Sequence, residues 1–164
     1  MGNVMRALFN RWGRLAWLLV CIMALSGCAL GRVEPGMTRD EVLARLGTPS
    51  RVVPLGSGTR LQYSGQPAAR HATMVDLDAA GRVVQARQVL NAHDFARIEP
   101  GKWTRQDVEL AFGPPAYVDR VASWPHEIMT YRWFEVVDLF FWVYLDQNNV
   151  VQRAHQGMEF YRDD

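Results

Sequence analysis

The sequence predicts an α+β fold made of two tandem units, each with two helices followed by an antiparallel sheet. Residues 98–115 repeat residues 33–49, and such self-similarity indicates one supersecondary unit that occurs twice. Each copy contains start and stop signals for a short helix, and each is followed by stretches in which apolar residues alternate. The predicted units are residues 28–97 and 98–164, after a signal segment at 1–27.

The N-terminal segment has the parts of a bacterial signal peptide. Three arginines precede an apolar stretch at 15–25, which is too short to span a bilayer as a helix. The tetrapeptide at 25–28, Leu-Ser-Gly-Cys, resembles the lipobox of lipoprotein precursors, which are cleaved before the cysteine and lipidated on it. The resemblance implies a lipid on Cys28. An ordinary signal peptide, or a membrane anchor with a chance cysteine, is the alternative.

The predicted mature chain contains 15 basic and 17 acidic residues, a balance that argues against nucleic acid as a partner. Cys21 would leave with the signal, so Cys28 is the one mature cysteine and no intrachain disulfide is expected. In lipoproteins of this kind, an Asp after the cysteine commonly retains the protein at the inner membrane. Ala29 stands there instead, which favours lipid anchoring in the outer membrane, facing the periplasm.

Each unit is predicted to begin with a short apolar element and a main helix. The first element is a short helix at 91–97 in the second copy, and in the first copy it would start almost at Cys28. In the main helix Thr38 and Glu41 have the spacing of a capping box, and Gly47 is placed to end the helix. The second copy repeats this pattern with Thr104, Asp107, Val108, Phe112 and Gly113.

Strands are predicted after each main helix. Alternation or apolar runs mark strands in the first copy at 60–64, 75–78 and 83–85, and in the second copy at 129–133, 139–146 and 150–152. A further short strand is expected in each copy, at 51–53 and 116–121. Asp78 and Asp146 begin turns in which Gly81 and Asn149 can adopt positive φ. We expect the two units to form one continuous antiparallel sheet.

The residues of the first copy carry a family resemblance. Gly-Met-Thr at 36–38, Val42, and Leu-Gly-Thr-Pro at 46–49 resemble the signature of the BamE/SmpA (OmlA) outer-membrane assembly lipoproteins. That family is related in fold to the β-lactamase inhibitor protein, which is a tandem of such units. The resemblance implies a non-catalytic lipoprotein that binds proteins as an accessory of envelope or outer-membrane protein assembly. A periplasmic inhibitor of a hydrolase is the alternative that the same resemblance supports.

Residue patterns of enzymes are not found. The four histidines, His71, His93, His126 and His155, show neither a His-x-x-x-His pair nor a His-x-Glu signature. No Gly-x-Ser-x-Gly sequence of a hydrolase nucleophile occurs either. We therefore expect no catalytic residue, no metal and no cofactor.

The second copy is unusually aromatic. Period-two alternation places Phe140, Trp142 and Tyr144 on the sheet face away from the helix, where the first copy has Ala72, Met74 and Asp76. These aromatics either form a binding surface or are buried where the two units join. We predict a partner-binding surface of Phe140, Trp142 and Tyr144, with Trp124 and Trp103 as further candidates.

Overall fold

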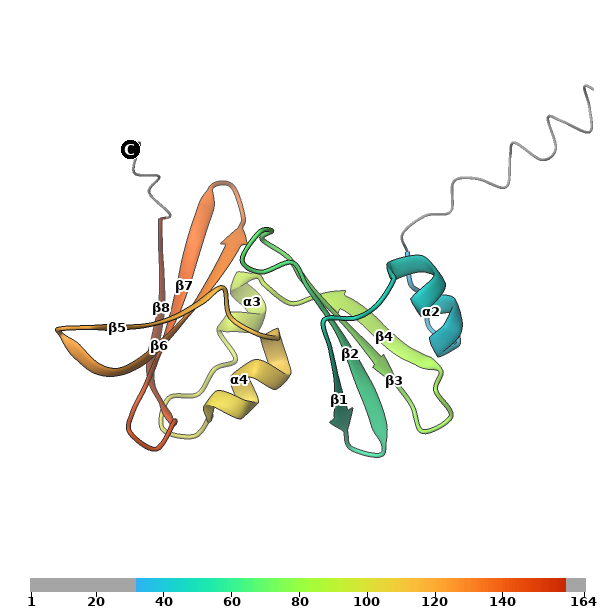
Figure 1. Ribbon diagram of the computed structural model, residues 1–164, viewed down its shortest axis with the longest axis horizontal. Helices are drawn as coiled ribbons and strands as arrows, with labels where there is room; N and C mark the ends of the chain where they lie inside the picture. The colour runs from blue at the N-terminus through green and yellow to red at the C-terminus, as the bar shows by residue number, and fades with distance from the viewer. Residues whose placement is uncertain (1–31, 159–164) are drawn as a thin grey trace, which may run out of the picture. The chain divides into compact units, whose positions relative to one another are not determined.

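The computed structural model describes residues 32–158, and the predictions about Cys28 and the signal segment concern residues outside this range. The described residues form two four-stranded antiparallel sheets with strands in sequence order (Figure 1). The first sheet contains β1 (Arg51–Leu55), β2 (Gly58–Ser64), β3 (Ala72–Leu77) and β4 (Val83–Gln88). The second contains β5 (Tyr117–Val121), β6 (Trp124–Phe134), β7 (Asp138–Leu145) and β8 (Val151–Met158). The helices are α2 (Arg39–Leu46), α3 (Ala92–Phe95) and α4 (Arg105–Phe112).

The predicted fold class is wrong. Antiparallel strands dominate the described chain, and its helices have only eight, four and eight residues. The helix-helix-sheet description gave the repeated helix motif too much weight, because so short a helix is stable only when a sheet covers it. The expected single continuous sheet is also wrong: β4 and β5 do not pair, and α3 and α4 lie between them in the sequence.

Local signals place the main helices where the sequence predicts them. The Thr38 hydroxyl accepts a hydrogen bond from the Glu41 amide, and the Glu41 carboxylate accepts one from the Thr38 amide at 2.7 Å. Thr104 and Asp107 form the same capping box at the start of α4. Gly47 and Gly113 end the helices with φ of +74° and +81°, a backbone conformation that favours glycine. The caps need only residues three or four apart, which is why the sequence reveals them.

The hairpin turns repeat as well. The Asp78 carboxylate accepts hydrogen bonds from the amides of Ala80 and Arg82, both at 2.9 Å. Asp146 does the same for Asn148 and Val150 in the second unit, where Asn149 has the positive φ. Each turn also joins its helix cap through an isolated bridge, Thr38 to Arg82 and Thr104 to Val150. The two units therefore share helix cap, turn and strand order.

The helices and sheets alternate in layers (Figure 1). α2 covers one face of the first sheet through a core of Val42, Leu61, Val75, Leu77 and Val83. α3 and α4 cover one face of the second sheet, and Met74 and Ala72 from the opposite face of β3 join that second core. α4 thus packs between the two sheets, whereas no described helix covers the remaining face of the second sheet.

None of the helices in the described part of the chain is both long and apolar enough to cross a membrane.

Candidate functional site

The uncovered face of the second sheet holds most of the predicted site. Strand pairing aligns Tyr144 with Ile128 and Arg153, and Trp142 with Thr130 and His155. Paired residues of an antiparallel sheet point to the same side, so β6, β7 and β8 all contribute side chains there. We name this surface the aromatic face, defined by six residues: Trp124, Phe140, Trp142, Tyr144, Arg153 and His155.

The rings of the aromatic face contact one another across three strands. Trp124 meets Tyr144 edge-on at a centroid distance of 5.4 Å, and Tyr144 stacks on His155 at 5.2 Å. Trp142 lies 5.3 Å from His155 and 5.7 Å from Phe140. The four aromatic side chains are half-buried, because each ring shields its neighbours while its outer side stays open. The face is thus a continuous surface of rings.

Two local features hold the indoles in place. The Trp124 Nε1 donates a hydrogen bond to the Leu145 carbonyl at 2.8 Å, which satisfies the polar end of that ring. Gly157 lies opposite Phe140 and next to Trp142, where a Cβ would come within 2.7 Å of the Trp142 ring. The ring therefore occupies the space that a side chain at 157 would fill. Both features restrict the positions that the two indole rings can take.

Arg153 gives the aromatic face a positive charge. Its guanidinium carbon lies 3.9 Å from the Tyr144 centroid and 5.5 Å from that of Trp124, a cation–π arrangement. Arg153 is exposed, and it forms no ion pair with any residue between 32 and 158. Its charge is available to a carboxylate or to carbonyl oxygens of a bound partner. Arg, Trp and Tyr together are the residue types that most often dominate binding energy at protein interfaces.

The structure separates Trp103 from the other predicted site residues. Trp103 packs against the second core, 6.3 Å from Phe112, on the side of the sheet that α4 covers. Its amide and carbonyl join the turn before α4 to Glu99 and Val151. Phe140, Trp142, Tyr144 and Trp124 are together, and Trp103 is not with them. The two sheets do not pair, so the aromatics of β7 do not lie within one continuous sheet, although Asp138 at the start of β7 pairs with Arg70 of the first unit.

α4 covers the face of the first sheet that corresponds to the aromatic face of the second. We name it the receiving face, and define it by six residues: Arg51, Arg60, Gln62, Met74, Asp76 and Arg87. Arg60 donates to the Leu110 carbonyl at 2.9 Å, and Gln62 donates to the Glu109 carbonyl at 2.9 Å. Both carbonyls lie in the last turn of α4, where the final four carbonyls lack donors from within the helix, and the Glu109 carbonyl also accepts from the Gly113 amide at 2.9 Å. The first sheet thus caps the C-terminal end of a helix that belongs to the second unit.

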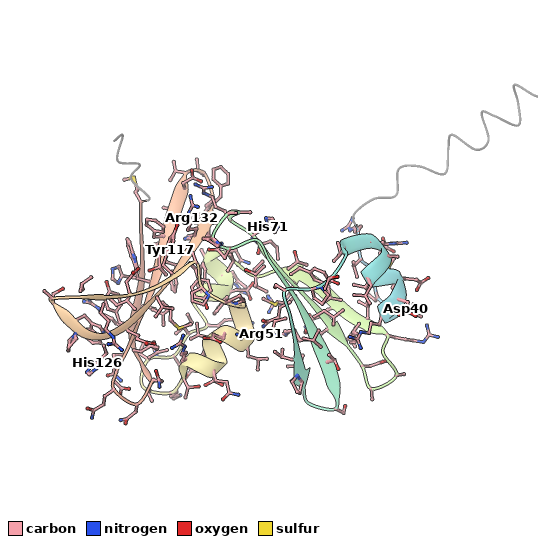
Figure 2. All side chains as sticks on the ribbon, viewed as in Figure 1. Asp40, Arg51, His71, Tyr117, His126 and Arg132 are labelled. Carbon is pink, nitrogen blue, oxygen red and sulfur yellow. The ribbon has the colours of Figure 1, made fainter. Side chains whose placement is uncertain are left out.

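Charges reinforce this contact between α4 and the receiving face. Arg51 on β1, at the side nearest α4, pairs with Glu109 at 2.8 Å (Figure 2). Burial alone would raise the pKa of Glu109, but hydrogen bonds from Arg51 and Arg105 lower it below its ordinary value. Burial opposes ionisation of Asp76 in the same way, and hydrogen bonds from Arg60 and Gln85 lower its pKa. Both carboxylates are therefore held ionised at neutral pH.

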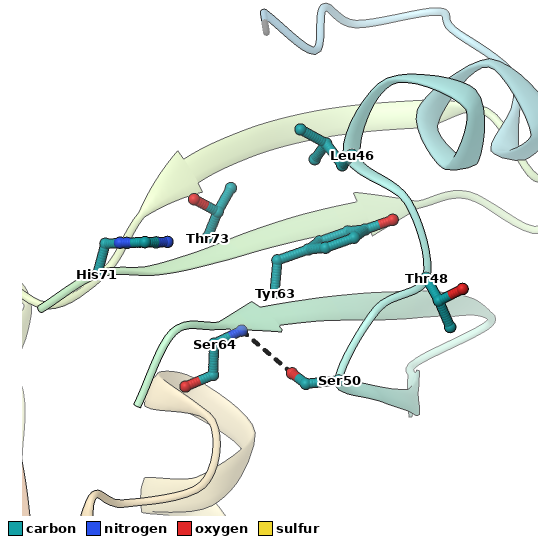
Figure 3. A pocket seen from close by; sticks show the side chains of 7 residues that line it. All are labelled: Leu46, Thr48, Ser50, Tyr63, Ser64, His71 and Thr73. Atoms are coloured by element: carbon teal, nitrogen blue, oxygen red, sulfur yellow. Dashed lines mark hydrogen bonds between the residues drawn. The ribbon is translucent and has the colours of Figure 1, made fainter. Parts of the chain in front are cut away.

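A hollow of about 360 Å³ lies on the opposite face of the first sheet, beside α2 (Figure 3). It is lined by Leu46, Thr48, Ser50, Tyr63, Ser64, His71 and Thr73. In the second unit the corresponding place is filled by Phe95, which contacts Phe112, Tyr131 and Phe141. Within the described part of the first unit no side chain takes the place of Phe95.

Sequence reasoning missed several residues of the aromatic face and of the receiving face. Arg153, His155 and Gly157 become neighbours of the aromatics only through the pairing of β7 with β8. The turn at Asp146 sets the pairing register of β7 and β8, so this pairing could have been predicted from the sequence. No sequence pattern marks the buried Arg60–Asp76 ion pair, because the helix that covers it, α4, lies about 50 residues further along the chain. Among residues 32–158 no group of three His, Cys, Asp or Glu side chains is arranged to hold a metal ion.

Comparisons with known proteins add one distant likeness. No protein-family model and no curated protein sequence matches the chain. A search of solved structures finds a DUF4309 family protein (YjgB) from Bacillus subtilis, with 13% sequence identity and a TM-score of 0.30. The match covers 81% of this chain and 83% of that one. A likeness at this level carries no argument about fold or function.

Proposed function

We propose that this chain is a non-catalytic lipoprotein of the outer membrane that binds another envelope protein as an accessory of outer-membrane protein assembly. The aromatic face carries the proposal. It presents four large rings and an arginine that forms no ion pair within residues 32–158, and contiguous aromatic surfaces of this kind mark interaction sites. Lipid on Cys28 would hold the chain at the periplasmic side of the membrane, and the second sheet would present the face to its partner.

Removing two rings from the aromatic face is expected to abolish capture of the partner. The Trp142→Ala, Tyr144→Ala double variant should still fold, because both rings are half-buried and lie outside the two cores. Affinity purification from detergent-solubilised envelopes, followed by mass spectrometry, measures the partner retained by each variant. Barrel-assembly components should be recovered with the native chain and lost with the double variant.

A matched control separates binding from folding. Val84→Ala with Val136→Ala removes side chains that are 58% and 84% exposed and are not part of the aromatic face, so capture should be unchanged. If the double aromatic variant loses its cooperative thermal transition, those rings belong to the folding core and the binding proposal fails.

The same purification tests the alternative function. A periplasmic inhibitor of a hydrolase would use the aromatic face as well, because a rigid sheet of rings and one arginine suits an enzyme surface equally. It would bring down a soluble hydrolase in place of barrel-assembly components. Recovery of that enzyme, with its activity suppressed in the complex, would replace the assembly proposal by the inhibitor one.

Replacing the lipidated cysteine is expected to release the protein from membranes. Cys28→Ser removes the thiol that would carry the acyl chains, and without them no stable anchor remains. Fractionation of cells into soluble periplasm, inner membrane and outer membrane measures the shift. Serine at position 26 offers a control: Ser26→Ala keeps a small residue before the cysteine and should leave the protein in the outer membrane. Retention of the Cys28→Ser variant in the membrane pellet would contradict lipid anchoring.

A further inference from the structure

The internal repeat relates the aromatic face to a surface that already binds a helix. Strand register matches the row Arg60–Asp76–Gln85 of the first sheet with Ile128–Tyr144–Arg153 of the second. The next row, Gln62–Met74–Arg87, matches Thr130–Trp142–His155 in the same way. The receiving face therefore corresponds, row by row, to the aromatic face. One of the two is covered by α4, and the other is uncovered within the described chain.

From this correspondence we infer that the aromatic face receives α2 of a second copy of this chain, as the receiving face receives α4. α2 is the repeat counterpart of α4: both have eight residues, the same capping box and the same terminal glycine. The inference rests on the proposed function, because it names a partner for the surface proposed there to bind protein. It adds the prediction that the protein assembles head to tail.

The chemistry of both surfaces changes together at matched positions. In the existing contact Glu109 of α4 pairs with Arg51 of β1 at 2.8 Å. Their counterparts, 66 residues away in each case, are Leu43 of α2 and Tyr117 of β5. A charged helix residue thus faces a charged strand residue within the chain, and an apolar helix residue would face an aromatic strand residue between chains. Such paired replacement keeps the two surfaces complementary.

The end of the helix shows the same correspondence. A Cβ at Gly113 would lie 3.3 Å from the Met74 side chain, so α4 approaches the receiving face closely at its terminal glycine. Gly47 ends α2 in the same conformation, but a Cβ there would meet nothing within 4 Å. The counterpart of Met74 is Trp142, a larger apolar side chain able to cover that open glycine. Arg153 can donate to the last carbonyls of the helix, as Arg60 does for α4.

This contact joins two different surfaces, so it is heterologous. Each copy would offer α2 at one side and the aromatic face at the other, and the array continues until an end is blocked. At one end of any array an aromatic face stays free, where the envelope partner of the proposed function can bind. Self-assembly and partner binding are therefore compatible on one chain.

Cross-linking between full-length chains in native membranes tests the inference. Leu43→Cys is placed in one chain and Tyr117→Cys in a second, differently tagged chain, and a short bismaleimide is added to intact envelopes. Docking raises the effective concentration of the two thiols, so the mixed product should exceed that of a Leu43→Cys and Val84→Cys pair by about tenfold or more. A chain that carries both Leu43→Cys and Tyr117→Cys should give a ladder of oligomers.

Further variants decide the outcome. Trp142→Glu in the Tyr117→Cys chain should abolish the mixed product, whereas Val136→Glu in that chain should leave it unchanged. A product that links two Leu43→Cys chains, or a mixed product no greater than the Val84→Cys control, overturns the inference. If that happens while Trp142→Ala with Tyr144→Ala still abolishes capture of an envelope protein, the proposed function stands and only self-assembly fails.

Discussion

Replacing Arg60 by methionine is expected to lower the free energy of unfolding by about 3–5 kcal/mol, the usual cost of removing one partner of a buried ion pair. The Arg60 guanidinium binds both Asp76 carboxylate oxygens, at 2.6 and 2.8 Å, and the two residues are only 8% and 5% exposed. Without Arg60 the Asp76 charge stays buried, and the Leu110 carbonyl of α4 loses its donor. Urea denaturation followed by tryptophan fluorescence measures the loss.

Two comparisons isolate the ion pair. Arg51→Met removes another arginine from the same receiving face, but the Arg51 side chain is 44% exposed, so its loss should cost no more than about 1 kcal/mol. Arg60→Met combined with Asp76→Leu removes both charges together and should recover most of the stability. If Arg60→Met alone costs no more than Arg51→Met, the buried pair does not hold the two units together.

The pH dependence of stability should have the sign of a lowered carboxyl pKa. Although burial opposes ionisation, the hydrogen bonds from Arg60 and Gln85 lower the folded-state pKa of Asp76. The stabilisation from this pair is then complete above the unfolded value, about 3.9, and is lost as the pH falls through the lower folded-state pKa. An acid titration of the native chain and of the Arg60→Met, Asp76→Leu variant compares the two, and the variant should lack this acid loss.

Phe95→Ala is expected to destabilise the chain by about 3–5 kcal/mol, the usual cost of removing a large buried ring. Phe95 is 3% exposed and stacks on Phe141 at a centroid distance of 4.0 Å. It also contacts Phe112 at 5.0 Å and Trp133 at 5.6 Å, so its removal leaves a cavity where α3, α4 and the second sheet meet. Thermal unfolding monitored by circular dichroism measures the change.

Phe134→Ala is the matched control for Phe95→Ala. Phe134 is 57% exposed near the hairpin between β6 and β7, and its truncation should change stability by no more than about 0.5 kcal/mol. The first unit has a hollow where the second has Phe95, so a cost below about 1 kcal/mol for Phe95→Ala would mean that the second unit also tolerates an empty place there.

Most elements that could be predicted from the sequence depend on neighbours along the chain. The capping boxes at Thr38 and Thr104 and the turns at Asp78 and Asp146 involve residues at most four apart, and the structure has all four. Alternation placed Phe140, Trp142 and Tyr144 on one side of β7, and there they lie together. The fold class was wrong because short helices with clear signals were given the weight of long ones.

The helix caps, the turns and the aromatic alternation of β7 could be predicted from the sequence, because each depends on local geometry and side-chain period. Which sheet faces are covered depends on contacts that form in the folded chain. Asp76 and Tyr144 are repeat counterparts on equivalent strands, yet Asp76 is buried beside α4 and Tyr144 lies on a face that no described helix covers. That difference arises from a contact between distant segments, in which α4 of the second unit packs on the first sheet. No pattern within either strand encodes it.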